Sequence, residues 1–135
     1  MKILGFNFTK VNAERLKEVS GKITINTEID FPNFKELKQD FLKTKEPILE
    51  ASFSYKVKYE PEFAIVVIDG KILFSVDEKL AKETLKGWKK KNVPDEVRIP
   101  LINSVLKKAS LKAMSLEDEL NLPLHLPLPT FKKSE

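Results

Sequence analysis

One block of the sequence, residues 49–74, constrains the fold more than any other. From Leu49 to Tyr59 every second residue is apolar, and the residues between them are Glu, Ser or Lys. This alternation is typical of a β-strand with one buried face and one solvated face. The run that follows, residues 63–68, is apolar on both faces, as in a strand inside a sheet.

The Asp69-Gly70 pair within this block leaves two interpretations open. A two-residue hairpin turn would return the chain as a partner strand over residues 72–76. Alternatively, Gly70 is a bulge in one long bent strand. Of the two, we favour the hairpin.

A first strand is predicted over residues 3–11, with Leu4, Phe6 and Phe8 on one face. The residues that follow, 12–19, have apolar side chains at helical spacing after a possible N-cap. They fit a short helical turn, and they fit a continuing strand and loop equally well.

A second strand is predicted over residues 22–31, where apolar and polar residues alternate cleanly. We expect Pro32 to end this strand, because proline donates no hydrogen bond to a sheet ladder. Residues 33–45 then place apolar side chains three and four positions apart. This spacing fits a short amphipathic helix or a loop with one turn.

Two helices are predicted after the strands. Residues 78–91 carry an apolar stripe that includes Trp88, and Asp77 is a suitable N-cap. Trp88 is therefore expected in the core. The second and longest helix is predicted to begin at residues 94–96.

The longer helix has apolar residues at nearly every fourth position as far as Leu120. Pro100 is tolerated if it lies in the first turn and would otherwise kink the helix. Ser115 and Asp118 resemble a second N-cap, so a break near Met114 is possible.

The C-terminal segment LNLPLHLPLPTF, residues 120–131, alternates leucine with proline or histidine. Its three prolines exclude a helix and an internal sheet ladder, which leaves an extended conformation near polyproline II. The leucines are too apolar to stay in solvent, so the segment is expected to lie across the protein or a partner. Residues 132–135 are predicted to be a disordered basic tail after a single domain over residues 1–131.

Composition limits the classes of function. The sequence has 135 residues, which suits one domain, and no cysteine. No apolar run is long enough for a membrane helix, and no segment resembles a signal peptide, so we expect a cytoplasmic protein without membrane insertion. We expect no metal, cofactor or catalytic site and no enzyme activity, because there is one histidine and no glycine-rich phosphate loop. His125 is expected on the surface, and the acidic run 117–119 as solvated helix surface.

The formal net charge is +4, and the excess lies in residues 71–135, with 13 basic and 9 acidic residues. A basic half is compatible with a nucleic-acid-binding module. We do not favour this function, because the basic runs fit solvated helix ends and a tail.

Three segments of the sequence carry a resemblance to a known family. They are EFAIVVIDGKILFSVD (62–77), PDEVRIPLINSVL (94–106) and LNLPLHLPLPTF (120–131). Together they resemble the SecB protein-export chaperone and its SecB-like relatives. The resemblance implies a four-stranded antiparallel sheet with helices on one face, and a homo-oligomer, a dimer or a dimer of dimers. It also implies a chaperone that holds unfolded polypeptide in apolar grooves without ATP.

These considerations lead to one prediction for the whole chain. It is an α+β domain with an antiparallel sheet of about four strands, followed by two helices and the proline-rich segment. The leading function is a SecB-like holdase, and a dedicated-partner adaptor linked to a toxin–antitoxin pair is the alternative. Coupling to the export motor is not carried over, because the chain is basic and shows no acidic strand face. The residues expected to contact polypeptide are Phe6, Phe8, Phe53, Tyr55 and Leu124.

Overall fold

Four antiparallel strands form one sheet in the order β1-β4-β3-β2. The structure is a computed structural model, and it describes residues 1–18, 21–38 and 46–133. In chain order the strands are β1 (Lys2–Arg15), β2 (Thr24–Leu37), β3 (Ile48–Glu60) and β4 (Ala64–Ser75). Helices α1 (Glu78–Lys89) and α2 (Asp95–Glu119) follow them. The predicted α+β class, with about four antiparallel strands before two helices, is confirmed.

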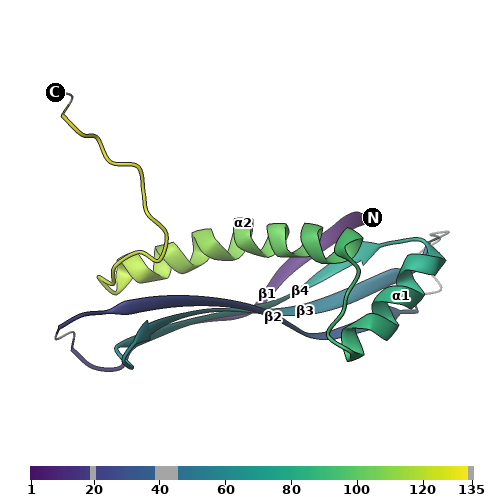
Figure 1. Cartoon of the computed structure of the whole chain (residues 1–135), viewed down its shortest axis with the longest axis horizontal. Helices are drawn as coiled ribbons and strands as arrows, with labels where there is room; N and C mark the ends of the chain where they lie inside the picture. The colour runs from purple at the N-terminus through teal and green to yellow at the C-terminus, as the bar shows by residue number, and fades with distance from the viewer. Residues whose placement is uncertain (19–20, 39–45, 134–135) are drawn as a thin grey trace.

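Strand β3 carries the core, as its alternation predicts. Every second side chain from Leu49 to Tyr59 is buried, and those between them are half-buried on the other face. Helix α2 lies along the buried face, over β4 and β3, while α1 packs against β2 at one end of the sheet. Both helices contribute side chains to one hydrophobic core, and Figure 1 shows α2 above the sheet; among the described residues no helix covers the opposite face, which we call the open face.

Strand β4 is one continuous strand, so the hairpin predicted at Asp69-Gly70 is wrong. Gly70 pairs with Phe53 on one side and with Phe8 on the other. The bulge lies in β1, where Thr9 is the extra residue between the pairs of Phe8 and Lys10. A Cβ atom at Gly70 would lie 2.5 Å from two ring carbons of Phe53. The glycine therefore makes room for an aromatic ring rather than for a turn.

Strand β2 passes through Pro32 and continues to Leu37, so the predicted strand end is wrong. Two residues, Phe31 and Pro32, stand opposite Phe53 alone, because the register shifts between Asp30 and Asn33. Proline is accepted at bulges and on edge strands, and β2 is an edge strand. The helix or loop expected after Pro32 is also wrong as far as Leu37; residues 39–45 of that prediction lie outside the described residues.

The N-terminal strand is likewise longer than predicted. Residues 12–15 extend β1 and pair with β4. The continuing strand is thus the correct interpretation for these residues, and the helical turn is wrong.

The helices begin where the sequence predicts. Asp77 accepts a hydrogen bond from the Leu80 amide at 2.8 Å, which caps α1. Helix α2 is continuous over Met114, so the possible break there is absent. Neither helix in the described part of the chain combines the length and hydrophobicity that a membrane span requires.

Candidate binding groove

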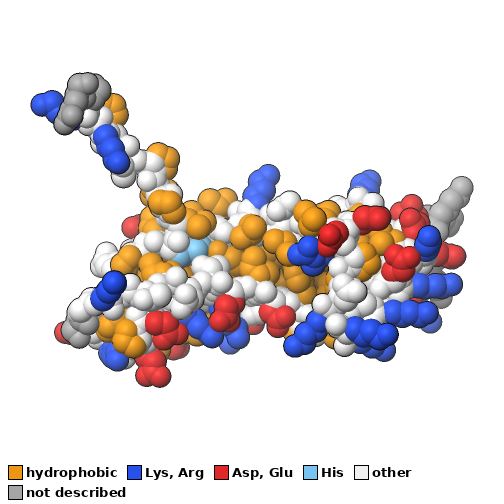
Figure 2. Space-filling model, viewed as in Figure 1, with side chains coloured by type: hydrophobic (Ala, Val, Ile, Leu, Met, Phe, Trp, Pro, Cys, Tyr) orange, Lys and Arg blue, Asp and Glu red, His pale blue; other side chains and the backbone are white. Residues whose placement is uncertain are grey.

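An apolar groove of about 550 Å³ opens between edge strand β2, the C-terminal end of α1 and the first half of α2. Figure 2 shows hydrophobic side chains gathered between α2 and the sheet on this side. The side chains that line the groove are Ile29, Asp30, Phe31, Pro32, Phe34, Trp88, Lys89, Lys91, Val93, Arg98, Leu101 and Ile102. We call this the β2–α2 groove.

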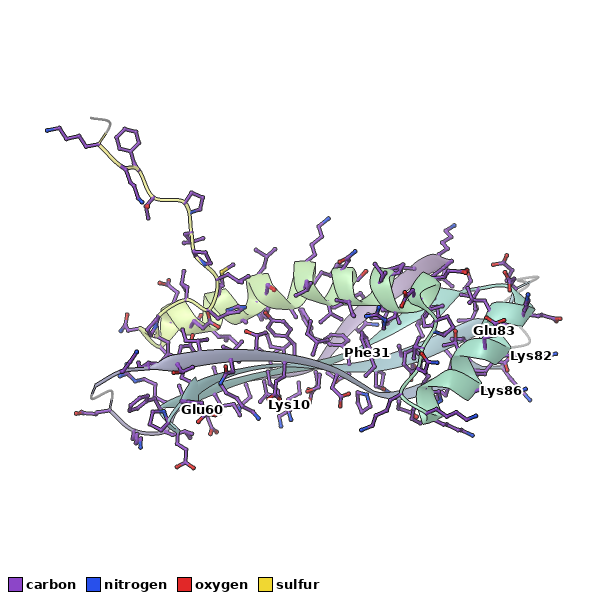
Figure 3. All side chains as sticks on the ribbon, in the orientation of Figure 1. Lys10, Phe31, Glu60, Lys82, Glu83 and Lys86 are labelled. Carbon is purple, nitrogen blue, oxygen red and sulfur yellow. The ribbon has the colours of Figure 1, made fainter. Side chains whose placement is uncertain are left out.

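The bulge in β2 helps to shape the wall of the groove. Because it adds one residue, both Phe31 and Phe34 lie on the face that packs toward the helices. Their rings are 5.9 Å apart, and the Phe34 ring lies 6.4 Å from that of Trp88. Figure 3 shows Phe31 between the sheet and the helices, with Lys10 on the opposite side of the sheet. Aromatic walls of this kind suit tolerant apolar contacts.

Apolar surface continues from the groove along α2. Ile102 lines the groove, and Ile99 and Leu106 lie three and four positions away, on the same side of the helix. These two side chains are 47% and 40% exposed, respectively. The accessible apolar strip is therefore longer than the groove itself.

A second aromatic cluster lies on the side of β1. Phe6 lies 5.0 Å from Phe53 and 5.4 Å from Phe8, measured between ring centroids. The Lys108 ammonium group of α2 lies 4.9 Å from the centroid of the Phe6 ring. This cluster brings together three of the five residues predicted to contact polypeptide, at a place distinct from the groove.

The five predicted contact residues differ in their exposure. Phe8 is 38% exposed, and Phe6 and Leu124 are half-buried. Phe53 and Tyr55 are each 1% exposed and lie beneath other parts of the same chain. None of the five lines the β2–α2 groove. Sequence reasoning missed the residues that do line it, since their proximity depends on a bulge and on the position of α1.

The position of His125 differs from its predicted position more than that of any other side chain discussed. Its imidazole is fully buried, so the predicted surface position is wrong. Nδ1 lies 2.9 Å from Oε1 of Glu117, and Nε2 lies 2.6 Å from the hydroxyl of Tyr55. The backbone N–H of His125 also donates to Glu117 Oε1, at 3.0 Å. With Nδ1–H donating to the carboxylate, Nε2 of a neutral ring accepts the hydroxyl proton of Tyr55.

Glu117 is also fully buried, unlike the exposed Asp118 and Glu119, so the expectation of a solvated acidic run fails at this residue. Oε2 of Glu117 lies 2.8 Å from His125 Nδ1 but outside hydrogen-bond geometry, and it has no other partner among the described residues. Burial raises the pKa of both Tyr55 and Tyr59, and the nearby Glu117 carboxylate adds to the effect. The Tyr55 hydroxyl also lies 3.1 Å from Oγ of the buried Ser110. We call Tyr55, Ser110, Glu117 and His125 the buried polar network.

The network fixes the start of the C-terminal segment. Leu122 is buried, and the Tyr59 hydroxyl donates to the Pro123 carbonyl. Beyond His125 the chain leaves the body of the protein (Figure 1), and Leu128 and Phe131 are exposed. Within residues 1–18, 21–38 and 46–133, no three His, Asp or Glu side chains are placed to hold a metal ion.

Comparison with known proteins shows that this chain is similar in fold to a solved structure. No protein-family model matches the sequence, and no curated protein matches it significantly. Among solved structures, the chain is similar to the SecB-like chaperone Rv1957 of Mycobacterium tuberculosis, solved in complex with a ChAD peptide from the antitoxin HigA1, Rv1956. The TM-score is 0.52 at 13% sequence identity, over 97% of this chain and 89% of that one.

The chain has the SecB-like fold. The resemblance noted in the sequence is confirmed at this level, as that of a distant relative. At 13% identity the likeness concerns the arrangement of the strands and helices and not the residues of any site.

Proposed function

We propose that this protein is a SecB-like chaperone that holds extended, non-native polypeptide segments in the β2–α2 groove without nucleotide. The observation that carries the proposal is an open groove with Phe31, Trp88 and Ile102 in its walls, on a SecB-like fold. A volume of about 550 Å³ accommodates a few large side chains rather than a folded domain. Each large apolar side chain fully buried there would contribute roughly 1.5–3 kcal/mol before the entropic cost of ordering the segment.

The geometry favours an extended ligand. The groove runs beside edge strand β2, whose outer backbone groups are not paired within the described sheet. A sheet edge can add an extended peptide as a further strand, although the bulge at Phe31 and Pro32 interrupts pairing at that point. Side-chain burial in the groove is therefore the main source of affinity, which makes binding tolerant of sequence.

The five residues that the sequence predicts to contact polypeptide are proposed to have a supporting role. Phe6, Phe8 and Leu124 have accessible surface and are proposed as additional contacts. Phe53 and Tyr55 are proposed to support that surface from below, since both are buried. A homo-oligomer, a dimer or a tetramer, and a cytoplasmic location belong to the same proposal.

Light scattering tests the proposal. A chemically unfolded client is diluted with and without the protein, at matched subunit concentration and without nucleotide. Suppression of aggregation near stoichiometry is the expected result. A lack of suppression, at a temperature where the protein is folded, would contradict a general chaperone.

A dedicated-partner adaptor is the second candidate. The observation that favours it is that the similar Mycobacterium chaperone was solved with a peptide from an antitoxin. An adaptor would bind one partner segment tightly and leave the aggregation of unrelated clients unchanged. The light-scattering experiment with several unrelated clients thus separates the two candidates.

A further inference from the structure

The rim of the β2–α2 groove is positively charged. Three basic residues, Lys89, Lys91 and Arg98, line it, against one acidic residue, Asp30. Within residues 1–18, 21–38 and 46–133, no carboxylate lies at ion-pair distance from Lys89 or Lys91. Both lysines are exposed, so their charges act on whatever enters the groove.

On the open face of the sheet, some lysines are paired with carboxylates. There, Glu50 lies 3.6 Å from Lys35 and 3.5 Å from Lys71. Lys58 likewise lies 3.2 Å from Glu28. Lys35, Lys58 and Lys71 are thus paired with carboxylates, whereas Lys10 and Lys56 on the same face, like Lys89 and Lys91 at the groove rim, have no carboxylate partner among the described residues.

Favourable interaction with a helix dipole explains the position of only one of the three basic residues at the groove rim. Lys89 is in the last turn of α1, where a cation is favourable. Lys91 lies beyond that helix, and Arg98 lies in the first turn of α2, where a cation is unfavourable. Asp95 offsets Arg98 at 2.7 Å, which leaves Lys89 and Lys91 as the unneutralised pair.

We propose that the β2–α2 groove selects extended apolar segments that carry Asp or Glu beside their apolar residues. This inference rests on the proposed function and names the chemistry of its ligand. The apolar walls bind the apolar side chains, and Lys89 and Lys91 attract the flanking carboxylates. Segments flanked by Lys or Arg are disfavoured because they place like charges at the rim.

Three fluorescently labelled peptides test the inference. They share one apolar core of Leu, Ile and Phe, and their flanks are Glu-Glu, Ser-Ser or Lys-Lys. Fluorescence anisotropy measures their affinities at low and at high salt. We expect the acidic peptide to bind about three- to tenfold tighter than the basic one at low salt, since exposed charge pairs contribute modestly. The difference should shrink when salt screens the rim.

Two double variants distinguish an effect of the rim lysines on affinity from an effect of the net charge of the protein. K89Q/K91Q is expected to weaken binding of the acidic peptide about three- to fivefold and to leave the neutral peptide unchanged. K10Q/K112Q makes the same change in net charge at two exposed residues outside the groove lining, Lys10 on the opposite side of the sheet (Figure 3) and Lys112 in the second half of α2, and should leave all three affinities unchanged. D30N removes the one acidic lining residue and is expected to tighten binding of the acidic peptide.

The possible outcomes are distinct. Equal affinities for the three peptides, or a preference for the basic one, would overturn this inference and leave the proposed function standing. Failure of all three peptides to bind would count against the proposed function itself. An acidic preference that K89Q/K91Q leaves intact would also overturn the assignment to the groove rim.

Discussion

His125 and Glu117 form a fully buried pair that joins the C-terminal segment to helix α2, with Nδ1 2.9 Å from Oε1. Both the ring and the backbone N–H of His125 donate to the same carboxylate oxygen. The carboxylate is thus held by a segment that has no helix or strand of its own. The proline-rich segment is attached to the body through a polar contact as well as through Leu122.

Replacing His125 tests how much this pair contributes. His125→Ala removes both the ring hydrogen bond to Glu117 and that to Tyr55 and leaves a buried carboxylate poorly solvated. We expect the free energy of unfolding to fall by about 2–4 kcal/mol, measured by urea denaturation. Leu128→Ala, an exposed residue of the same segment, is the control and should change stability by less than about 0.5 kcal/mol. An equally small effect for His125→Ala would show that the pair does not stabilise the fold.

The two tyrosines provide a pH-dependent prediction. The sequence contains only Tyr55 and Tyr59, and burial raises the pKa of both above the usual value of 10.0. The folded state therefore holds these protons more tightly than the unfolded state. This contribution to stability is fully present below about pH 10 and is lost as pH rises above it.

Absorbance at the tyrosinate band measures this directly. In the folded protein we expect the phenolate signal to appear at higher pH than in the unfolded chain, because the pKa of both tyrosines is raised. In concentrated urea both tyrosines should titrate near about 10. A folded protein whose tyrosines titrate normally would refute the buried placement.

Gly70 is predicted to resist substitution. A Cβ atom at this position would lie 2.3 Å from the Asn7 carbonyl oxygen and 2.5 Å from the Phe53 ring. Gly70→Ala should therefore lower the free energy of unfolding by about 1–3 kcal/mol, because the ring or strand β1 must move. Gly5→Ala is the matched control, since the nearest atom to its Cβ would lie at 3.8 Å. Equal effects of the two substitutions would argue against the close packing of Phe53 on Gly70.

These examples show what the sequence could and could not predict. The alternation in β3 and the N-cap at Asp77 are local signals, and both were confirmed. Asp69-Gly70 is also a local turn signal, but the ring of Phe53 on the neighbouring strand determines why glycine is there.

The errors at Pro32 and His125 have a similar origin. A proline ends a strand only where its missing N–H would be needed, and the bulge on an edge strand removes that need. His125 is buried because it meets Tyr55, 70 positions earlier in the chain. Neither circumstance appears in the pattern around the residue itself. The groove was missed for the same reason, since it joins β2, α1 and α2.

Phe31 offers a test of the groove by mutation. Phe31→Ser removes an aromatic wall that is only partly buried, so the fold should persist while client capture weakens about three- to tenfold. Phe131→Ser makes the same change on a fully exposed side chain and should leave capture unchanged. Suppression of client aggregation is the measurement. Equal capture by both variants would contradict a role for the groove.

Trp88 makes the central claim directly measurable. It is the single tryptophan in the sequence, it lines the β2–α2 groove and it is half-buried in the free protein. The first measurement is its emission spectrum during titration with a permanently unfolded client that lacks tryptophan. We predict a saturable shift to shorter wavelength that Phe31→Ser weakens. An unchanged spectrum, while the anisotropy of a labelled client shows that it is bound, would place binding elsewhere and contradict the account.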